Sequence, residues 1–370
     1  MKLSVMQENL ARGLSVVSRA VSSRSTLPVL ANVLLRTEDA GLKLTATNLE
    51  IGITYWVPGK IETDGATTVP ARLLTDLVSS LPSSERVDLE LQGADTLHVR
   101  AGRFATHVKG IDADEFPTIQ TAGERPTTRV SQKVLKRALD ETVFAAASDE
   151  ARPILTGVLA RFEGDKLTLA AADNYRIAVQ TIAILDPVEA ASVVIPARAL
   201  NELSRILADT DDPVELVLAQ AKNQVLFHLE GVDIVSRLID GQFPNYQQVL
   251  PAAHTTRAEI DREELLRAVR PAALIASSSA NIVKLAVSSD AGVVVTATAE
   301  VGDYTGDVEA TVEGDATTIA FNARYLNDVL SNVQADRFAL ELNGPLSPGV
   351  FRPVGDDDYV HVVMPVRTTS

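Results

Sequence analysis

The side chains best suited to acid–base or metal chemistry stand apart from one another in this sequence. Its five histidines are His98, His107, His228, His254 and His361, and no two of them have the spacing of metal ligands. An isolated histidine is usually a surface or strand-end residue, although its pKa would suit acid–base catalysis. We therefore predict neither a catalytic residue nor a metal site among the histidines, and we expect no cofactor.

The other motifs of catalytic and nucleotide-binding sites are absent or incomplete. Gly59-Lys60 lacks the upstream glycine and the Ser or Thr of a phosphate-binding loop, and no HExxH, GxSxG or GxGxxG motif occurs. The acidic run Asp356-Asp-Asp358 lacks the alternating ligands and the glycine of a calcium loop, so we interpret it as a solvated turn. The sequence has no cysteine, which excludes thiolate nucleophiles and disulfides. A β-rich enzyme with dispersed catalytic residues stays as an alternative.

The chain that carries these residues repeats itself with a period of about 126 residues. The clearest marker is an Ala-Arg pair, which occurs at Ala71-Arg72, Ala197-Arg198 and Ala323-Arg324. Pro70, Pro196 and Asn322 stand before the three pairs. Proline at the first helical position and asparagine at an N-cap both mark the start of a helix. Because apolar residues follow at helical spacing, we predict a short amphipathic helix at each pair.

Each repeat also contains alternating apolar residues upstream of its Ala-Arg pair. Leu42, Leu44 and Ala46 have counterparts 125 to 126 residues apart in the second and third repeats. Alternation with a period of two indicates a half-buried strand. Turns precede these strands, at Asp39-Ala-Gly41, Gly164-Asp165 and Asp290-Ala-Gly292. Before the first two turns lie Pro28-Val-Leu30 and Pro153-Ile-Leu155, which we interpret as earlier strands of hairpins.

A further amphipathic segment opens each repeat, at Leu10, Leu135 and Leu265, so a repeat contains two helices among many strands. The first two repeats end on Glu115-Phe-Pro117 and Gln242-Phe-Pro244. We therefore predict an α+β protein with three repeated domains, at residues 1–122, 123–252 and 253–370. Such a repeated architecture typically offers a continuous surface to an extended partner.

The composition is that of a globular protein with an acidic surface. Hydrophobic residues make up 46% of the chain, and no apolar stretch reaches the roughly 18 residues of a membrane span. No signal-peptide core follows the N-terminus, so we expect a cytoplasmic protein with no membrane partner. The net charge of −15 by itself argues against a nucleic-acid binder, because such proteins carry a basic footprint.

Five motifs in fixed order nevertheless resemble a known family. They are Thr26-Leu-Pro-Val-Leu30, Thr68-Val-Pro-Ala-Arg72, Ala172-Asp-Asn-Tyr-Arg-Ile-Ala178, Phe243-Pro-Asn-Tyr246 and Val362-Val-Met-Pro-Val-Arg367. Together with the length and the three repeats, they resemble the beta subunit of bacterial DNA polymerase III, the beta sliding clamp. The resemblance implies DNA-clamp domains with antiparallel outer sheets and inner helices, which close into a ring as a head-to-tail homodimer.

The resemblance also implies a function without catalysis. The ring would encircle double-stranded DNA without sequence specificity and act as processivity factor of the replicative polymerase. Its other partners would be the polymerase alpha subunit, the clamp loader and further proteins with clamp-binding motifs. A clamp paralogue specialised for repair or drug resistance is the alternative within the family.

If the resemblance holds, the positive charge should gather in the elements that face DNA. The six expected inner helices and their turns comprise residues 2–24, 72–81, 132–152, 198–208, 261–277 and 324–333. They contain 15 Lys and Arg against 11 Asp and Glu, so they carry +4 and the remainder of the chain carries −19. We expect a mildly basic interior inside an acidic exterior, which favours sliding over tight phosphate binding.

The residues expected to face DNA are all arginines: Arg24, Arg72, Arg198, Arg205 and Arg324. Arg24 and Arg205 match DNA-facing positions of the family. The other three stand at helix N-termini, where the macrodipole disfavours a cation by up to about 1 kcal/mol. Either an incoming phosphate or an intramolecular carboxylate would explain an arginine there.

Two further surfaces are implied by the resemblance. The family's partner-peptide groove, which receives a segment ending in Leu-Phe, matches Leu155, Ala172, Asn174, Tyr175, Arg176, Ile177, Pro244, Val249, Leu346, Val362, Met364 and Pro365. Many members have Thr-Asp-Gly-His-Arg-Leu where this chain has Ala172-Asp-Asn-Tyr-Arg-Ile177, a departure that affects the fine specificity of the groove. The dimer interface matches Phe104, Val108, Leu274 and Ile275.

Overall fold

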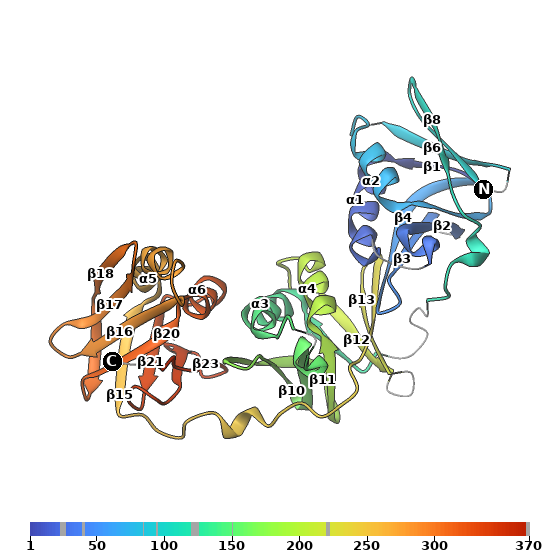
Figure 1. Ribbon diagram of the computed structural model, residues 1–370. Coiled ribbons are helices and arrows are strands. Elements are labelled where there is room, and N and C mark those ends of the chain that lie inside the picture. The colour runs from blue at the N-terminus through green and yellow to red at the C-terminus, as the bar shows by residue number, and fades with distance from the viewer. Residues whose placement is uncertain are drawn as a thin grey trace. The chain divides into compact units, whose positions relative to one another are not determined.

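The computed structural model describes residues 1–22, 27–38, 41–83, 85–93, 95–119, 126–149, 151–219 and 223–367 (Figure 1). The chain forms two compact units. One unit comprises Met1–Ser131 and Asp212–Leu238, and the other comprises Gln132–Asp211 and Ile239–Ser370. Within the described residues, the first unit contains one antiparallel sheet and the second contains two, with helices packed against each.

The first unit contains two helices, α1 (Gln7–Val17) and α2 (Ala71–Ser79), within its described residues. Its strands are β1 (Lys2–Met6), β2 (Asn32–Glu38), β3 (Gly41–Thr47), β4 (Ile51–Thr63), β5 (Ala66–Pro70), β6 (Arg86–Gln92), β7 (Thr96–Ala101), β8 (Phe104–Lys109), β9 (Thr128–Ser131), β12 (Pro213–Ala219), β13 (Gln224–Leu229) and β14 (Val232–Arg237). They form one sheet in the order β8-β7-β6-β1-β4-β14-β13-β12-β9, from which β2, β3 and β5 branch. In this order β8 is an edge strand.

Helix α1 is held against the sheet by its apolar stripe. Leu10, Leu14 and Val17 are fully buried, as their helical spacing predicts. Gly13 allows the close approach, because a Cβ atom there would lie 2.9 Å from the side chains of Leu44 and two other strand residues. Helix α2 packs beside α1 on the same sheet.

The second unit carries four helices in its described residues: α3 (Gln132–Thr142), α4 (Ala197–Ile206), α5 (Arg262–Ala276) and α6 (Ala323–Asn332). Its strands are β10 (Gly157–Ala172), β11 (Arg176–Pro196), β15 (Thr256–Asp261), β16 (Ile282–Ser288), β17 (Gly292–Ala299), β18 (Gly302–Val308), β19 (Ala310–Gly314), β20 (Thr317–Asn322), β21 (Arg337–Leu342), β22 (Gly349–Pro353) and β23 (Tyr359–Val363). One sheet runs β10-β11-β23-β22-β21-β15-β19 and the other β18-β17-β16-β20.

The predicted period is confirmed at the helices. Helices α2, α4 and α6 begin at the three Ala-Arg pairs, 126 residues apart, and α1, α3 and α5 are the second helices of the three repeats. Asn322 is the N-cap of α6, and its side chain accepts a hydrogen bond from the Arg324 N–H, as predicted. Pro70 and Pro196 stand at the N-cap positions of α2 and α4, one residue earlier than expected.

Two predicted strands are wrong. Pro28–Ala31 and Pro153–Thr156 are 3₁₀ turns, and the strands begin after them, at Asn32 and Gly157. Each turn has proline at its start, where the fixed φ of the ring and its missing N–H suit a helical turn. The predicted turn at Gly164 is instead an irregularity inside β10, where the glycine has φ of +60°. Asp39 and Ala40, of another predicted turn, lie outside the described residues.

The sheets continue across the predicted domain boundaries. Strand β14, from the second repeat, pairs with β4 of the first, and β23, from the third, pairs with β11 of the second. The compact units therefore divide the second repeat between them, because its two groups of strands belong to different sheets. Boundaries at residues 122 and 252 stay a prediction.

Candidate partner-binding and DNA-facing surfaces

The turn between β10 and β11 presents the first part of the expected peptide site. Ala172 and Ile177 pair across the hairpin. The Asp173 carboxylate accepts hydrogen bonds from the N–H groups of Tyr175 at 2.7 Å and Arg176 at 2.9 Å. An aspartate side chain that bonds the backbone two residues on is a common device for fixing a tight turn. The turn thereby holds Tyr175 outward, with 56% of its surface exposed.

Strand β23 brings the second part to the same place. Val362 pairs with Ile177, and the N–H of Met364 donates to the Tyr175 carbonyl at 2.8 Å. Beneath this contact Leu155, Ala172, Ile177 and Val362 belong to one buried apolar cluster. The hairpin and the C-terminal strand, almost 200 residues apart in the sequence, are therefore one surface.

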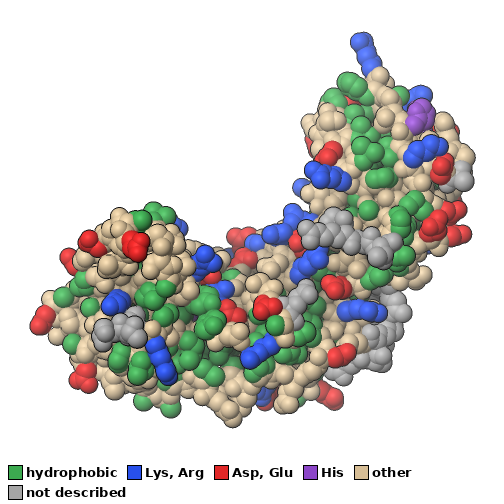
Figure 2. Space-filling model, in the orientation of Figure 1, with side chains coloured by type: hydrophobic (Ala, Val, Ile, Leu, Met, Phe, Trp, Pro, Cys, Tyr) green, Lys and Arg blue, Asp and Glu red, His purple; other side chains and the backbone are tan. Residues whose placement is uncertain are grey.

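Two other segments adjoin this surface. Phe243 and Tyr246 pack into the same cluster, which holds the chain that carries Pro244 and Val249 against it. Leu346 lies in the loop leading to Gly349, and Gly349 pairs with Val363. Figure 2 shows apolar side chains gathered where Figure 1 places β10 and β23.

The twelve expected peptide-site residues thus divide into two layers. The exposed ones are Asn174, Tyr175, Pro244, Val249, Leu346 and Met364, while Leu155, Ala172, Ile177 and Val362 are buried below and Arg176 and Pro365 are half-buried. We call the exposed six the peptide surface. The buried four lie directly beneath it and support it.

Arg176 is bonded inside the unit rather than turned outward. Its guanidinium donates to Asp173 at 3.2 Å, to the Phe144 carbonyl at 2.8 Å and to Asp328 of α6. It also lies 4.7 Å from the ring centroid of Tyr325, within the range of a cation–π interaction. Arg176 therefore fixes the hairpin to α6 and positions the peptide surface.

The arginines expected to face DNA stand exposed at equivalent places. Arg72, Arg198 and Arg324 are the second residues of α2, α4 and α6. Arg72 is 96% exposed and only 3.9 Å from Asp76, which makes a weak pair at most. Among the described residues, Arg198 and Arg324 form no ion pair. Arg205 differs, because Glu202 partly neutralises it at 3.2 Å, and Arg24 lies outside the described residues.

The four expected interface residues differ in exposure. Leu274 on α5 is 75% exposed and Phe104 on the edge strand β8 is 60% exposed. Ile275 is half-buried against the core of its domain. Val108 is buried, with 3% of its surface exposed, so it can take part in an interface only through its backbone.

Metal clusters and membrane spans are both missing from the part of the chain that the structure describes. Among these residues, no three His, Cys, Asp or Glu side chains are placed to hold a metal ion. None of the helices in the described ranges is long and apolar enough to cross a membrane.

Three family models match in succession along the chain. The N-terminal domain of the DNA polymerase III beta subunit matches residues 1–120, the central domain residues 129–245 and the C-terminal domain residues 247–367. A relative described as a beta sliding clamp, from Synechococcus elongatus, is 36% identical over the full length of both chains. The chain belongs to the beta sliding clamp family.

Solved sliding clamps have the same fold. The DNA polymerase sliding clamp from Bacillus subtilis is 30% identical, with a TM-score of 0.94 over the whole of both chains. A sliding clamp from Pseudomonas aeruginosa bound to griselimycin is also 30% identical, with a TM-score of 0.92 and complete coverage. The predicted fold of three α+β clamp domains with antiparallel sheets is thereby confirmed.

The family membership confirms the predicted function. This clamp is a DNA sliding clamp, the processivity factor of DNA polymerase III, and an accessory subunit without catalysis of its own. The alternative of a β-rich enzyme with dispersed catalytic residues is thus wrong.

Tyr175 gives the peptide surface of this clamp a feature that the sequence did not reveal. Its ring stacks on Tyr325 of α6, with the centroids 6.1 Å apart and the planes 23° from parallel. Tyr325 follows the recognisable Arg324, and it is only partly buried where it packs against the core of its domain. No periodic signal relates it to a hairpin 150 residues away, so only the structure brings the two rings together.

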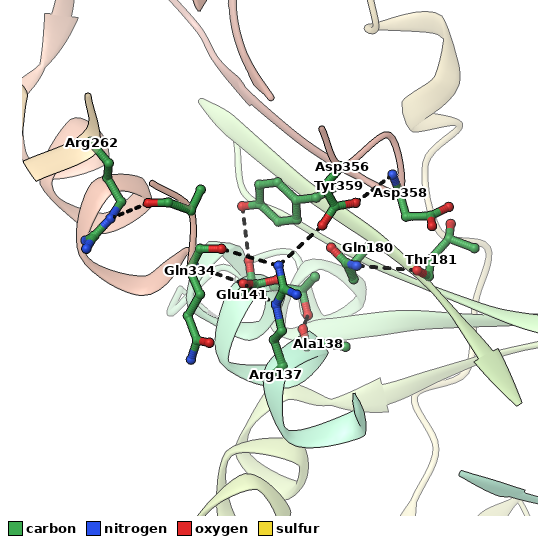
Figure 3. Close-up of polar contacts among 12 residues, drawn as sticks. Arg137, Ala138, Glu141, Gln180, Thr181, Arg262, Gln334, Asp356, Asp358 and Tyr359 are labelled. Carbon is green, nitrogen blue, oxygen red and sulfur yellow. Dashed lines mark hydrogen bonds and ion pairs between the residues drawn. The ribbon is translucent and has the colours of Figure 1, made fainter. Parts of the chain in front are cut away.

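A partly buried polar cluster joins α3 to the C-terminal domain (Figure 3). Glu141 is fully buried, and its Oε1 accepts from Arg137 Nε at 2.9 Å and from the Gln334 N–H at 2.9 Å. Arg137 also pairs with Asp356 at 3.3 Å. Burial raises the pKa of Glu141, although these donors oppose the effect. Asp356, predicted to lie in a solvated turn, is thus also part of the domain junction.

Two aromatic residues of β23 complete the cluster. The buried Tyr359 hydroxyl donates to the Glu141 carbonyl at 3.1 Å. His361 is fully buried between Tyr359 and Phe144, with its Nε2 lacking a hydrogen-bond partner among the described residues. Burial, aided by the nearby Arg176 cation, lowers the pKa of His361 to about 3. The imidazole is therefore neutral at physiological pH and acts as a core residue.

Proposed function

We propose that two copies of the chain close head to tail into a ring around double-stranded DNA. The internal repeat supports this most directly. The last strand of the second repeat, β14, pairs with β4 of the first, and the last strand of the third, β23, pairs with β11 of the second. In the described part of the chain, this series leaves β8 of the first repeat and β18 of the third without a partner strand from another repeat. Each of the two lies at the edge of its sheet. Pairing β8 of one copy with β18 of another completes the series and removes both edges.

Side chains beside the two edges fit such an interface. Leu274 is the most exposed large apolar residue on α5, and α5 packs against β18. Phe104, on β8, is a large apolar side chain that is 60% exposed at the other edge. Single exposed apolar residues are common on protein surfaces, so these two support an interface through their position beside the two sheet edges. Leu274 and Phe104 are our interface anchors, with Ile275 and the backbone at Val108 as supports.

The ring would hold DNA by topology and touch it only weakly. Arg72, Arg198 and Arg324 occupy equivalent helix N-termini, and six such arginines per dimer could meet backbone phosphates without reading bases. The −19 carried by the rest of each chain would keep DNA away from the outside. Arg205 and Arg24 are secondary candidates for contacts inside the ring.

The peptide surface would tether the replicative polymerase alpha subunit, the clamp loader and other proteins with clamp-binding motifs. Exposed apolar anchors such as Tyr175, Val249 and Met364 suit capture of an extended peptide that ends in Leu-Phe. A tethered polymerase rebinds DNA intramolecularly, which can raise its avidity by roughly 10² to 10⁴. Since the sequence has no phosphate-binding loop, loading would need a separate ATP-using partner.

Topology is the property that tests this proposal. Clamp loaded onto nicked circular DNA should remain with the DNA through gel filtration and should be lost after a single restriction cut. A protein that binds the DNA surface would remain equally on both forms. Equal retention before and after the cut would therefore contradict encirclement.

A further inference from the structure

The first unit contains a second copy of the backbone arrangement that forms the peptide surface. In the turn between β3 and β4, Thr47 pairs with Gly52, as Ala172 pairs with Ile177. The Asn48 side chain accepts from the N–H groups of Glu50 and Ile51 at 3.0 and 2.8 Å. These are the bonds that Asp173 forms in the other turn.

The strand that pairs with this hairpin, β14, also does so in the same way as β23 in the second unit. Val235 of β14 pairs with Gly52, as Val362 of β23 pairs with Ile177. The N–H of Arg237 donates to the Glu50 carbonyl at 2.9 Å, which is the counterpart of the bond from Met364 to Tyr175. The equivalence therefore extends to individual hydrogen bonds.

A pocket opens at this second position. It has a volume of about 270 Å³, and its apolar walls include Leu49, Pro117, Ile119 and Val235. Pockets for drug-sized ligands measure roughly 300 to 1,000 Å³, so this one suits one or two side chains of a peptide. The Ile119 side chain packs closely on Gly52, because a Cβ atom added to this glycine would lie 3.0 Å from it. Both residues line the pocket without filling it.

The chemistry of its rim differs from that of the peptide surface. Glu50 replaces Tyr175 and Arg237 replaces Met364 at the equivalent positions. Both charged residues are exposed, and neither forms an ion pair within the part of the chain that the structure describes. Leu49, 47% exposed at the tip of the turn, provides an apolar contact between them. An occupant would therefore need an apolar anchor and a carboxylate on the Arg237 side.

We propose that this pocket is a second, weaker docking site for a short extended peptide of a partner protein, with an apolar anchor next to an acidic residue. The proposal uses the proposed peptide surface as its analogue, but the pocket and its charges are features of the first unit alone. It gives each clamp subunit two docking positions of different specificity.

Methyl NMR on the full-length clamp tests the two positions separately. The probes are the amidated peptides acetyl-Asp-Leu-Phe and acetyl-Lys-Leu-Phe, titrated to millimolar concentration. We expect the methyl signals of Leu49, Ile119 and Val235 to shift, and the Asp peptide to bind there roughly threefold more tightly, the factor typical of one exposed ion pair. Methyl signals of Val249, Leu346 and Val362 report the peptide surface in the same spectra.

Two exposed variants serve as controls. Arg237→Glu should abolish the preference for the Asp peptide, and Met364→Ala should weaken the shifts at Val362 while leaving those at Leu49 unchanged. Absence of shifts at Leu49, Ile119 and Val235 at millimolar peptide would overturn the proposal, and an unchanged preference in Arg237→Glu would overturn its acidic component. Shifts at these three residues with none at Val362 would instead contradict the proposed peptide surface.

Discussion

Met364 lies where the C-terminal strand crosses the hairpin, with 37% of its surface exposed and its N–H held by Tyr175. Its side chain is therefore available to a ligand while its backbone is fixed. Anchors in desolvated pockets typically cost about 2 kcal/mol or more when truncated. We predict that Met364→Ala weakens binding of a Gln-Leu-x-Leu-Phe peptide about thirtyfold, as measured by calorimetry on the full-length clamp.

Leu185→Ala is the matched control for this variant, because Leu185 is an exposed apolar residue of the same unit, 56% accessible, and is not part of the peptide surface. Both variants should keep the wild-type melting temperature. Wild-type peptide affinity in a folded Met364→Ala protein would place the docking site elsewhere. A lower melting temperature with a general loss of function would make Met364 a core residue.

His361 makes the stability of the clamp depend on pH. Its pKa is about 3 in the folded chain and near 6.5 when unfolded, so the unfolded state binds the extra proton between these values. Stability is therefore full above pH 6.5 and is lost as the pH falls towards 3, by on the order of a few kcal/mol. The raised pKa of Glu141 acts oppositely, since its contribution is lost as the pH rises above 4.5.

His361→Phe should reduce this loss of stability at low pH, because a phenyl ring can still stack on Phe144 but does not titrate. Urea midpoints measured between pH 6.5 and 4 give the comparison, and the half-exposed His254→Gln is the control. An equally steep loss of stability in His361→Phe would mean that other groups cause the acid sensitivity.

At the scale of elements, local patterns predicted the helices and the half-buried strands. The Ala-Arg pairs located α2, α4 and α6 because capping and apolar spacing are properties of neighbouring residues. The strands predicted at Pro28 and Pro153 are wrong, since a short apolar run is compatible with either a strand or a tight turn. The sequence alone did not reveal that β14 would pair with β4, because strand pairing depends on partners almost 200 residues away.

The arrangement of the peptide site likewise could not be predicted from the sequence alone. The twelve expected peptide-site residues come from the resemblance to the family, whereas their division into an exposed and a buried layer comes from the structure. Arg176 is the clearest example, because the resemblance implies that it contacts the peptide, yet Asp328 and the Phe144 carbonyl hold it within the unit. Such networks assemble side chains from three elements and leave no local pattern.

The proposed dimer interface can be tested by substitutions on helix α5. Leu274→Lys combined with Ile275→Lys would place unpaired ammonium groups against the edge strand of a second copy, so we expect monomers in analytical ultracentrifugation. Leu274→Lys alone is the cleaner variant, since Leu274 is 75% exposed and its replacement leaves the core intact, unlike that of the half-buried Ile275. Leu185→Lys is the matched control and should stay dimeric. An unchanged dimer in the Leu274→Lys, Ile275→Lys protein would contradict the assigned interface.

At the scale of the whole molecule, the distribution of charge matters more than its sum. A net charge of −15 argues against a DNA-binding protein only if the charge is spread evenly. The six expected inner segments, which comprise the helices and their adjoining residues, carry +4, and the three exposed arginines repeat with the domains. A topological link needs no strong contact, so in the proposed ring a weak basic lining would be compatible with both retention on DNA and movement along it.

Replacing the three arginines together tests whether retention on DNA depends on their contacts with its phosphates. We predict that a clamp with Arg72→Ala, Arg198→Ala and Arg324→Ala stays dimeric, binds the polymerase peptide normally and is still retained on circular DNA. It should diffuse faster along stretched DNA in single-molecule tracking, because up to six phosphate contacts per ring are lost. Its diffusion should also depend less on salt, since each phosphate contact contributes about 0.9 to the slope of log affinity against log salt.

Arg161→Ala, which removes an exposed arginine paired with Glu163 outside these helices, should leave diffusion unchanged. Identical diffusion of the triple variant and the wild type at every salt concentration would show that these arginines do not touch the DNA.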